Sequence, residues 1–156
     1  MKSRQFFSFI SVFASLISLN CFAISFEVIG PCSSTPQYEG NFLVSDLSLS
    51  VGKTSVLIFD QNKIPYIGSE EGFSSILNTP IGMESIEVIS ETKMRAYGWC
   101  YSVNGVGPDV LADKYYFTND SDKLVWFFAY STYDNGNWID YCVPSYKIKA
   151  PQFCAK

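Results

Sequence analysis

The sequence predicts one α+β domain, in which a mixed sheet of several strands packs around a single short helix. Three observations support this fold class. Apolar and polar residues alternate in most segments, as they do in half-buried strands. One apolar segment follows residues that favour the start of a helix, and glycine and proline residues separate the segments. The roughly 133 residues after position 23 are enough for one domain with its own core.

The expected strands share the alternating pattern and are bounded by turn residues. In the first strand, Ile24, Phe26 and Val28 alternate with polar residues, and Gly30-Pro31 ends the pattern. A loop rich in serine and proline is expected at 32–41. The strands are expected at residues 24–29, 42–51, 86–89, 97–104, 115–118, 124–131 and 138–141.

The one helix is expected at residues 56–62. Either Thr54 or Ser55 is a suitable N-cap, because its hydroxyl can accept a bond from a free backbone N–H. Pro65 prevents the helix from continuing. The apolar face of this helix consists of Leu57, Ile58 and Phe59.

The strand at 97–104 has the clearest pattern. One of its faces carries Trp99, Tyr101 and Val103, and small residues occupy the other. Asn104-Gly105 follows this strand, and both residue types tolerate the positive φ of a tight turn. Further turns are expected at 120–122 and 134–136.

The first 23 residues have the features of an export signal that is removed from the mature protein. A short basic start precedes an apolar run at 6–19, which is too short to span a bilayer. Cys21-Phe22-Ala23 then places small residues at the two positions that a signal peptidase reads. We therefore expect cleavage after Ala23 and a periplasmic or secreted protein. A lipid anchor on Cys21 is the alternative, although the residues before it fit a lipobox poorly.

The acidic balance of the mature chain argues against polyanionic partners. Without the leader, nine basic and 15 acidic residues remain, a net charge of about −6. Only the scattered Lys147 and Lys149 approach a basic cluster. Nucleic acid is therefore not an expected partner, and no membrane span is expected in the mature chain.

Four cysteines remain after cleavage, and an even number in a small exported domain predicts two disulfides. A metal site is less compatible with the long spacings, the absence of C-x-x-C and the absence of histidine. Three connectivities are possible. The pairing expected here is Cys142 with Cys154 and Cys32 with Cys100.

No catalytic constellation is predicted, and the chain is expected not to be an enzyme. The chain has no histidine, which excludes Ser-His-Asp and Cys-His catalysis. Residues 52–54 resemble the end of a phosphate-binding loop, but Leu47 stands where its first glycine is needed. The acidic turn at 120–122 lacks the further ligands of a calcium loop. The neighbours Glu70-Glu71 do not face each other as glycosidase carboxylates must.

Aromatic residues are the remaining functional signal. Most of the rings are expected to build the core, but some are expected to line a surface for a flat or sugar-like ligand. The candidate ligand-binding residues are Trp99, Tyr101, Asn104 and Trp138.

The segment 97–131 resembles the transcobalamin-like C-terminal domain, a domain of unknown function in bacterial exported proteins. The similarity is carried by G-W-C-Y-S-V-N-G at 98–105, by Tyr116-Phe117 and by D-K-L-V-W at 122–126. It extends more weakly to residue 42 and implies a β-grasp-like fold over 42–131. Ser121 and Cys100 depart from the family pattern.

The resemblance divides the mature chain into three parts. Residues 24–41 form an N-terminal strand and loop, 42–131 form the β-grasp-like domain, and 132–156 form an extension with two cysteines. The helical domain that supplies most cobalamin contacts in transcobalamin is missing, so no cofactor is expected.

We expect an exported, non-enzymatic domain that binds a small molecule or a protein surface. A structural envelope component or secreted inhibitor is the first alternative, and a carboxylate-based hydrolase is the second.

Overall fold

The computed structural model describes residues 22–44 and 47–154. The expected signal peptide therefore lies outside the described residues, except for Phe22 and Ala23, and so does the alternative lipid site at Cys21. No helix in the described ranges has the length and apolar character needed to cross a bilayer.

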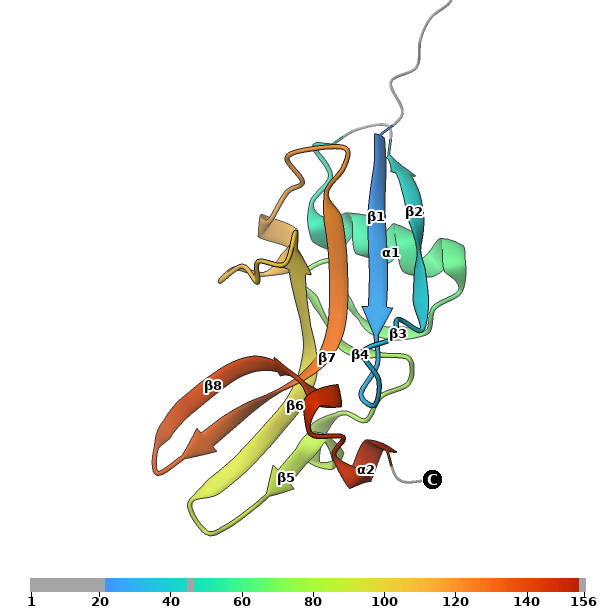
Figure 1. Ribbon diagram of the computed structural model, residues 1–156. Coiled ribbons are helices and arrows are strands. Elements are labelled where there is room, and N and C mark those ends of the chain that lie inside the picture. The colour runs from blue at the N-terminus through green and yellow to red at the C-terminus, as the bar shows by residue number, and fades with distance from the viewer. Residues whose placement is uncertain (1–21, 45–46, 155–156) are drawn as a thin grey trace, which may run out of the picture.

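A curled, mixed sheet of six strands forms the centre of the molecule (Figure 1). Its strand order is β2-β1-β7-β6-β5, and β8 also pairs with β7. The β1–β7 pair is parallel, whereas the other pairs are antiparallel. The strands are β1 (Phe22–Ile29), β2 (Tyr38–Val44), β5 (Ile86–Val88), β6 (Lys93–Val103), β7 (Lys123–Asp134) and β8 (Asn137–Pro144).

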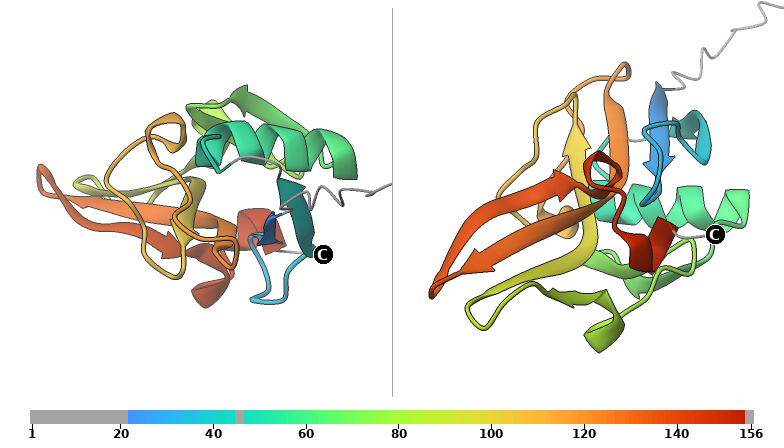
Figure 2. Two further views of the ribbon diagram at one scale, coloured as in Figure 1. Left: turned by 90° about the horizontal axis from the view of Figure 1, so that it is seen from above. Right: turned by 60° about the horizontal axis from the view of Figure 1, so that its bottom comes forward.

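The remaining elements are short and pack around this sheet. A hairpin of two strands lies beside the helix α1 (Figure 2). The expected strand at 115–118 is wrong, because only Tyr116 makes an isolated bridge there, to Ser50. These elements are α1 (Val51–Asn62), β3 (Tyr66–Ser69), β4 (Gly72–Ile76), η1 (Gly82–Ser85), η2 (Ala112–Lys114), η3 (Ser145–Lys147) and α2 (Pro151–Cys154).

The helix α1 begins five residues earlier than the sequence predicts. Ser50 is its N-cap, and the Ser50 hydroxyl accepts a bond of 3.1 Å from the backbone N–H of Lys53. The expected strand at 42–51 is consequently wrong in its second half, since β2 ends at Val44. The helix ends at Asn62, and Lys63 follows it with a positive φ of 55°.

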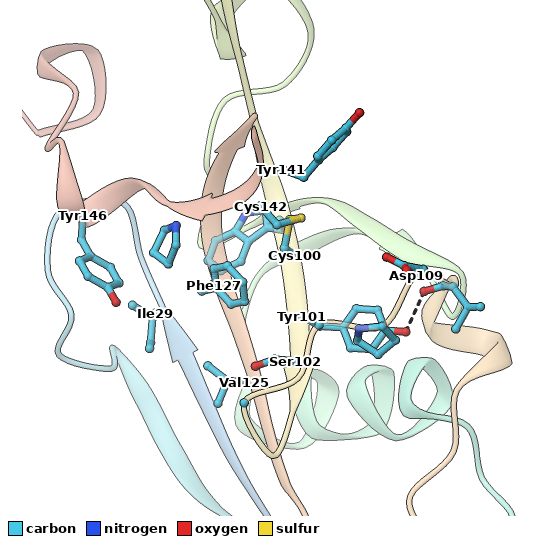
Figure 3. Close-up of a pocket in the computed structure, with 16 residues that line it drawn as sticks. Ile29, Cys100, Tyr101, Ser102, Asp109, Val125, Phe127, Tyr141, Cys142 and Tyr146 are labelled. Carbon is cyan, nitrogen blue, oxygen red and sulfur yellow. Dashed lines mark hydrogen bonds between the residues drawn. A yellow bond between two sulfur atoms is a disulfide. The ribbon is translucent and has the colours of Figure 1, made fainter. Parts of the chain in front are cut away.

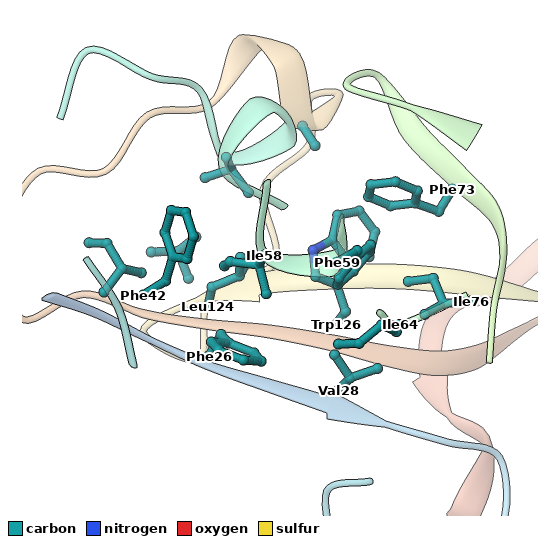
Figure 4. Packing of buried hydrophobic residues seen from close by; sticks show 14 of the residues in the cluster. Phe26, Val28, Phe42, Ile58, Phe59, Ile64, Phe73, Ile76, Leu124 and Trp126 are labelled. Carbon is teal, nitrogen blue, oxygen red and sulfur yellow. The ribbon is translucent and has the colours of Figure 1, made fainter. Parts of the chain in front are cut away.

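The main core lies between α1 and the sheet (Figure 4). Phe59 of α1 meets Phe73 of β4, and Phe73 meets Trp126 of β7, with ring centroids 4.9 Å apart in both pairs. The Trp126 indole N–H donates a bond of 2.8 Å to the Ser55 hydroxyl. That hydroxyl donates in turn to the carbonyl of Val51, so the Trp126 indole N–H and the Ser55 hydroxyl are both paired.

A second, smaller core joins the sheet to the C-terminal segment. Tyr97 of β6 and Phe128 of β7 are buried there with Ala150. Phe153 of α2 packs against both rings, at 4.8 Å from Tyr97 and 5.1 Å from Phe128. The extension after residue 131 is thus part of the packed structure.

Two disulfides are present, but the expected pairing is wrong. Cys32 pairs with Cys154, and Cys100 pairs with Cys142. The β7–β8 hairpin brings Cys142 back to β6, where Cys100 lies, so Cys142 is no longer free for Cys154. The chain then passes through η3 and α2, which place Cys154 beside the loop after β1.

Candidate functional site

The face of the sheet that α1 leaves open carries a groove of about 690 Å³ (Figure 3). Its floor follows from the alternation along β7. Leu124 and Trp126 point into the core under α1, so Val125 and Phe127 point to the opposite face. On the neighbouring β6, Ser102 lies on the same open face and completes the floor.

Phe127 lies where β7 changes its partner. Along one edge β7 pairs with β6 over most of its length, so β1 and β8 share the other edge. The β1 pairing extends to Ile29, opposite Phe127, and the β8 pairing starts with Pro144, opposite Ala129. Both Ile29 and Pro144 line the groove. The groove therefore forms at the position where one neighbouring strand ends and another begins.

A loop beside β6 makes one wall of the groove. Asn104 and Gly105 both have positive φ, 53° and 78°, as the expected tight turn requires. The turn sends the chain back along β6, and the backbone of Val106 bonds that of Val103. Further along, the Tyr101 hydroxyl donates a bond of 2.8 Å to the carbonyl of Val110. These bonds fix the wall at two points.

The other wall comes from β8 and η3, and a disulfide holds it in place. Cys142 is joined to Cys100 on the groove floor. The pairing of β7 with β8 shifts register near Thr132, and Cys142 itself has a positive φ of 49°. A register shift of this kind is a β-bulge, which bends the strand and lets β8 curl over the open face. Behind this wall, Ser145 donates to the carbonyls of Pro31 and Phe128.

Several polar groups of the groove are not used inside the protein. The side chains of Ser102, Asp109, Tyr141 and Tyr146 line it and make no hydrogen bond or ion pair with another residue of the described ranges. In Figure 3, Asp109 lies beyond Tyr101, whereas Tyr146 lies on the far side of Phe127. These four groups remain available to a ligand.

Trp99 and Tyr101, two of the predicted binding residues, link the groove to the core. The Trp99 indole N–H donates a bond of 2.7 Å to the Thr79 hydroxyl, and its ring packs against Phe128. The Tyr101 ring packs against Trp126, with centroids 5.2 Å apart. Burial raises the pKa of Tyr101, and the charges of Tyr115 and Asp113 add to the increase.

The side chain of Asn104, the third predicted residue, links two turns through hydrogen bonds. Its amide N–H donates to Asp122 at 2.8 Å, and its carbonyl oxygen accepts from the backbone of Lys123 at 2.9 Å. Asp122 also accepts bonds from the backbone N–H groups of Thr118 and Asn119 and from the Thr118 hydroxyl. Burial disfavours the charged Asp122 side chain, but these four bonds outweigh it and lower its pKa.

Trp138, the fourth predicted residue, lies outside the groove. It is 40% exposed on β8 and packs against Tyr133, with centroids 5.4 Å apart. It lines a smaller pocket of about 360 Å³ that shares Tyr141 and Cys100 with the groove. The four predicted residues therefore do not converge on one site.

Sequence reasoning missed Phe127, Val125, Ile29 and Tyr146 as groove residues. The alternation of β7 already placed Phe127 opposite the face of Trp126, and this signal could have identified the floor. Tyr146 and Ile29 are brought in by pairings between segments far apart in the sequence, which a local pattern does not reveal.

The acidic residues do not form a metal-binding cluster in the described part of the chain. Among the groove residues, Asp109 is the one carboxylate. Glu70 is paired with Lys53 at 2.7 Å. Within residues 22–44 and 47–154, no three histidine, cysteine, aspartate or glutamate side chains are arranged to hold a metal ion.

Comparison with known protein families gives a match to the middle part of this chain. Residues 70–129 match the family described as a domain of unknown function, DUF4430. This segment includes β4, β6 and much of β7, and it contains most of the block that suggested the transcobalamin-like resemblance. No curated protein matches the chain.

One solved structure, a candidate metal-binding protein from Ruminococcus gnavus ATCC 29149, is similar to the chain. The similarity covers 67% of this chain and 95% of that one, with 15% sequence identity and a TM-score of 0.38. Likeness at this level carries no conclusion about fold or ligand.

Proposed function

We propose that this protein is an exported, non-enzymatic binding domain, and that the groove on the open face of its sheet holds a small ligand. The observation that carries the proposal is the groove itself. Its volume of about 690 Å³ lies within the range of roughly 300–1,000 Å³ that is typical of small-molecule sites. Its floor is apolar at Val125 and Phe127, and a few unpaired polar groups surround that floor.

The construction of the walls supports a preformed site. One wall is tied to β6 by the Cys100–Cys142 disulfide, and the opposite wall is tied by the bond from Tyr101 to Val110. A site whose walls are already fixed loses little conformational entropy when a ligand binds. The two disulfides also suggest an oxidising compartment outside the cytoplasm.

The resemblance to the transcobalamin-like C-terminal domain and its β-grasp-like fold is part of this proposal, without cobalamin as the ligand. Catalysis by paired carboxylates has no support in the groove, where Asp109 has no second acid facing it. The binding role is therefore favoured over a hydrolase.

A screen of small fragments by NMR tests the proposal. Fragments are added to the ¹⁵N-labelled mature protein, and amide shifts are mapped on the structure. We expect the shifts to cluster at 100–102, 125–127 and 141–146. Ser102→Trp fills the groove and should abolish them. Ser121→Trp, which changes an exposed turn outside the groove, should leave them intact.

The screen also separates ligand binding from a protein-interaction role. Three large apolar side chains of β8 are exposed, with Trp138 at 40%, Ile139 at 56% and Tyr141 at 68%. Shifts confined to Trp138 and Ile139, and unchanged by Ser102→Trp, would favour an interaction surface. Shifts scattered over the protein, or none, would overturn the groove proposal.

A further inference from the structure

We infer that the ligand of the groove is a small organic cation with a flat or apolar body. The inference rests on the proposed function, because it concerns the same groove, and it adds the charge and shape of the ligand. It follows from the charges in the lining, from its aromatic rings and from the charge of the whole chain.

Asp109 gives the groove its charge. It is the one charged side chain among the lining residues, and no lysine, arginine or histidine accompanies it. Asp109 is exposed and has no hydrogen bond or ion pair with another described residue, so its carboxylate is free to bind a cation. An anionic ligand would meet this carboxylate and find no positive partner in the lining.

Aromatic rings make up much of the remaining lining. Phe127 lies on the floor, and Tyr141 and Tyr146 also line the groove. The Tyr101 ring packs on the core side of the sheet and lines the edge of the groove toward Val110. The face of an aromatic ring carries partial negative charge and attracts cations within about 6 Å. The aromatic lining and the exposed carboxylate of Asp109 therefore favour the same ligand, whose apolar body covers Phe127 and whose positive group approaches Asp109.

The charges outside the groove act in the same direction. The mature chain has an expected net charge of about −6. Several basic side chains elsewhere are paired with acids, as Lys53 is with Glu70, Arg95 with Glu87 and Lys123 with Glu27. Acidic charge in excess raises the local concentration of cations at a cleft. A neutral sugar would find hydrogen-bond partners in Ser102, the tyrosine hydroxyls and the Asp109 carboxylate, but it would gain no charge–charge attraction from that carboxylate.

The test compares two molecules of equal shape. The cation is 3-hydroxyphenyltrimethylammonium, and its neutral isostere is 3-tert-butylphenol. Each is titrated into the mature, oxidised protein in low-salt buffer at pH 7, and amide shifts of the groove residues give the affinity. We expect the cation to bind at least about fivefold more tightly, from the combined attraction of the rings and Asp109.

Asp109→Asn removes the negative charge while keeping the shape of the side chain. This variant should weaken binding of the cation about threefold or more and leave binding of the neutral isostere unchanged. Asp120→Asn, which changes an exposed acid outside the groove, is the matched control and should weaken neither. Raising the salt to 0.3 M should reduce the affinity for the cation alone.

The outcomes distinguish the two proposals. Equal binding of both molecules in the groove, unaffected by Asp109→Asn, would overturn the cation inference and leave the groove as a ligand site. An equal loss of cation binding in both aspartate variants would overturn a role of Asp109. If neither molecule binds and the fragment screen finds no groove ligand, both proposals fail.

Discussion

Removal of the Cys100–Cys142 disulfide is the most direct test of how the groove wall is held. The perturbation is the double substitution Cys100→Ala and Cys142→Ala. This bridge joins residues that are 42 apart in the sequence. Without the bridge the unfolded chain gains conformational entropy, and the loop-closure relation predicts a stability decrease of about 4 kcal/mol at 25 °C. That is a large part of the roughly 5–15 kcal/mol by which domains are stable.

The second bridge provides an internal comparison. Cys32 and Cys154 are 122 residues apart, so Cys32→Ala with Cys154→Ala is expected to cost about 5 kcal/mol. The difference of about 1 kcal/mol depends only on the ratio of the two separations, because the length-independent part of the loop-closure entropy is the same for both bridges. The longer bridge should therefore contribute more, although it lies near the end of the chain.

Urea unfolding followed by tryptophan fluorescence measures both losses, and the slope of the transition shows whether unfolding remains two-state. Wild-type protein reduced with dithiothreitol is the control, since it lacks both bridges and retains every sulfur atom. Intact mass of the oxidised double variants confirms that the remaining bridge has formed. A loss below about 1 kcal/mol for the shorter bridge, or a larger loss for the shorter than the longer bridge, would refute the reasoning.

Three further predictions concern single residues. Asp122→Asn should cost about 2–3 kcal/mol at pH 7, because the carboxylate accepts four bonds. The lowered folded-state pKa of Asp122 means that this contribution is present above about pH 4 and is lost as the pH falls through the folded value. Urea titrations from pH 7 to pH 2 should therefore show the variant approaching wild type in acid, and a constant gap would contradict this. Ser55→Ala leaves the buried indole N–H of Trp126 without its partner. The free energy of unfolding should fall by about 1–3 kcal/mol, measured by thermal unfolding. An unchanged transition would mean that water replaces the hydroxyl. Gly52→Ala places a methyl group onto the backbone carbonyl of Glu70, between β3 and β4, and should lower the free energy of unfolding in urea by about 1–3 kcal/mol. The methyl group of Gly72→Ala meets open space, so that variant should be near neutral. Equal effects of the two variants would refute the packing argument.

Much of the fold could be predicted from local sequence. Alternation identified most strands of the main sheet, and Asn104-Gly105 predicted a tight turn that the structure confirms. The start of α1 was misplaced because residues 47–51 also alternate and so resembled the end of a strand. Ser50 resolves this competition in favour of the helix, because its hydroxyl caps the N–H of Lys53.

The disulfide pairing and the groove depend on contacts between distant segments, and local patterns carry little information about them. Cys142 and Cys154 are close in sequence, yet β8 and α2 lead them to different partners. In the same way, the strand at 97–104 showed which residues share a face but not which face α1 would cover. Trp99 and Tyr101 lie on the face packed with the core, and Phe127 lies on the open one.

The pairing of β7 explains why a groove and a large aromatic ring occur together. Along one edge of β7, β1 ends and β8 begins, and a gap is left where the partner strand changes. Here the gap lies between Ile29 of β1 and Pro144 of β8. Phe127 covers the floor at this position, and the disulfide to Cys142 keeps β8 bent over it. Replacement of Phe127 by leucine should therefore weaken ligand binding more than stability, since the ring lies in the groove and not in either buried cluster. Equal losses of binding and of unfolding free energy would instead assign Phe127 to the core.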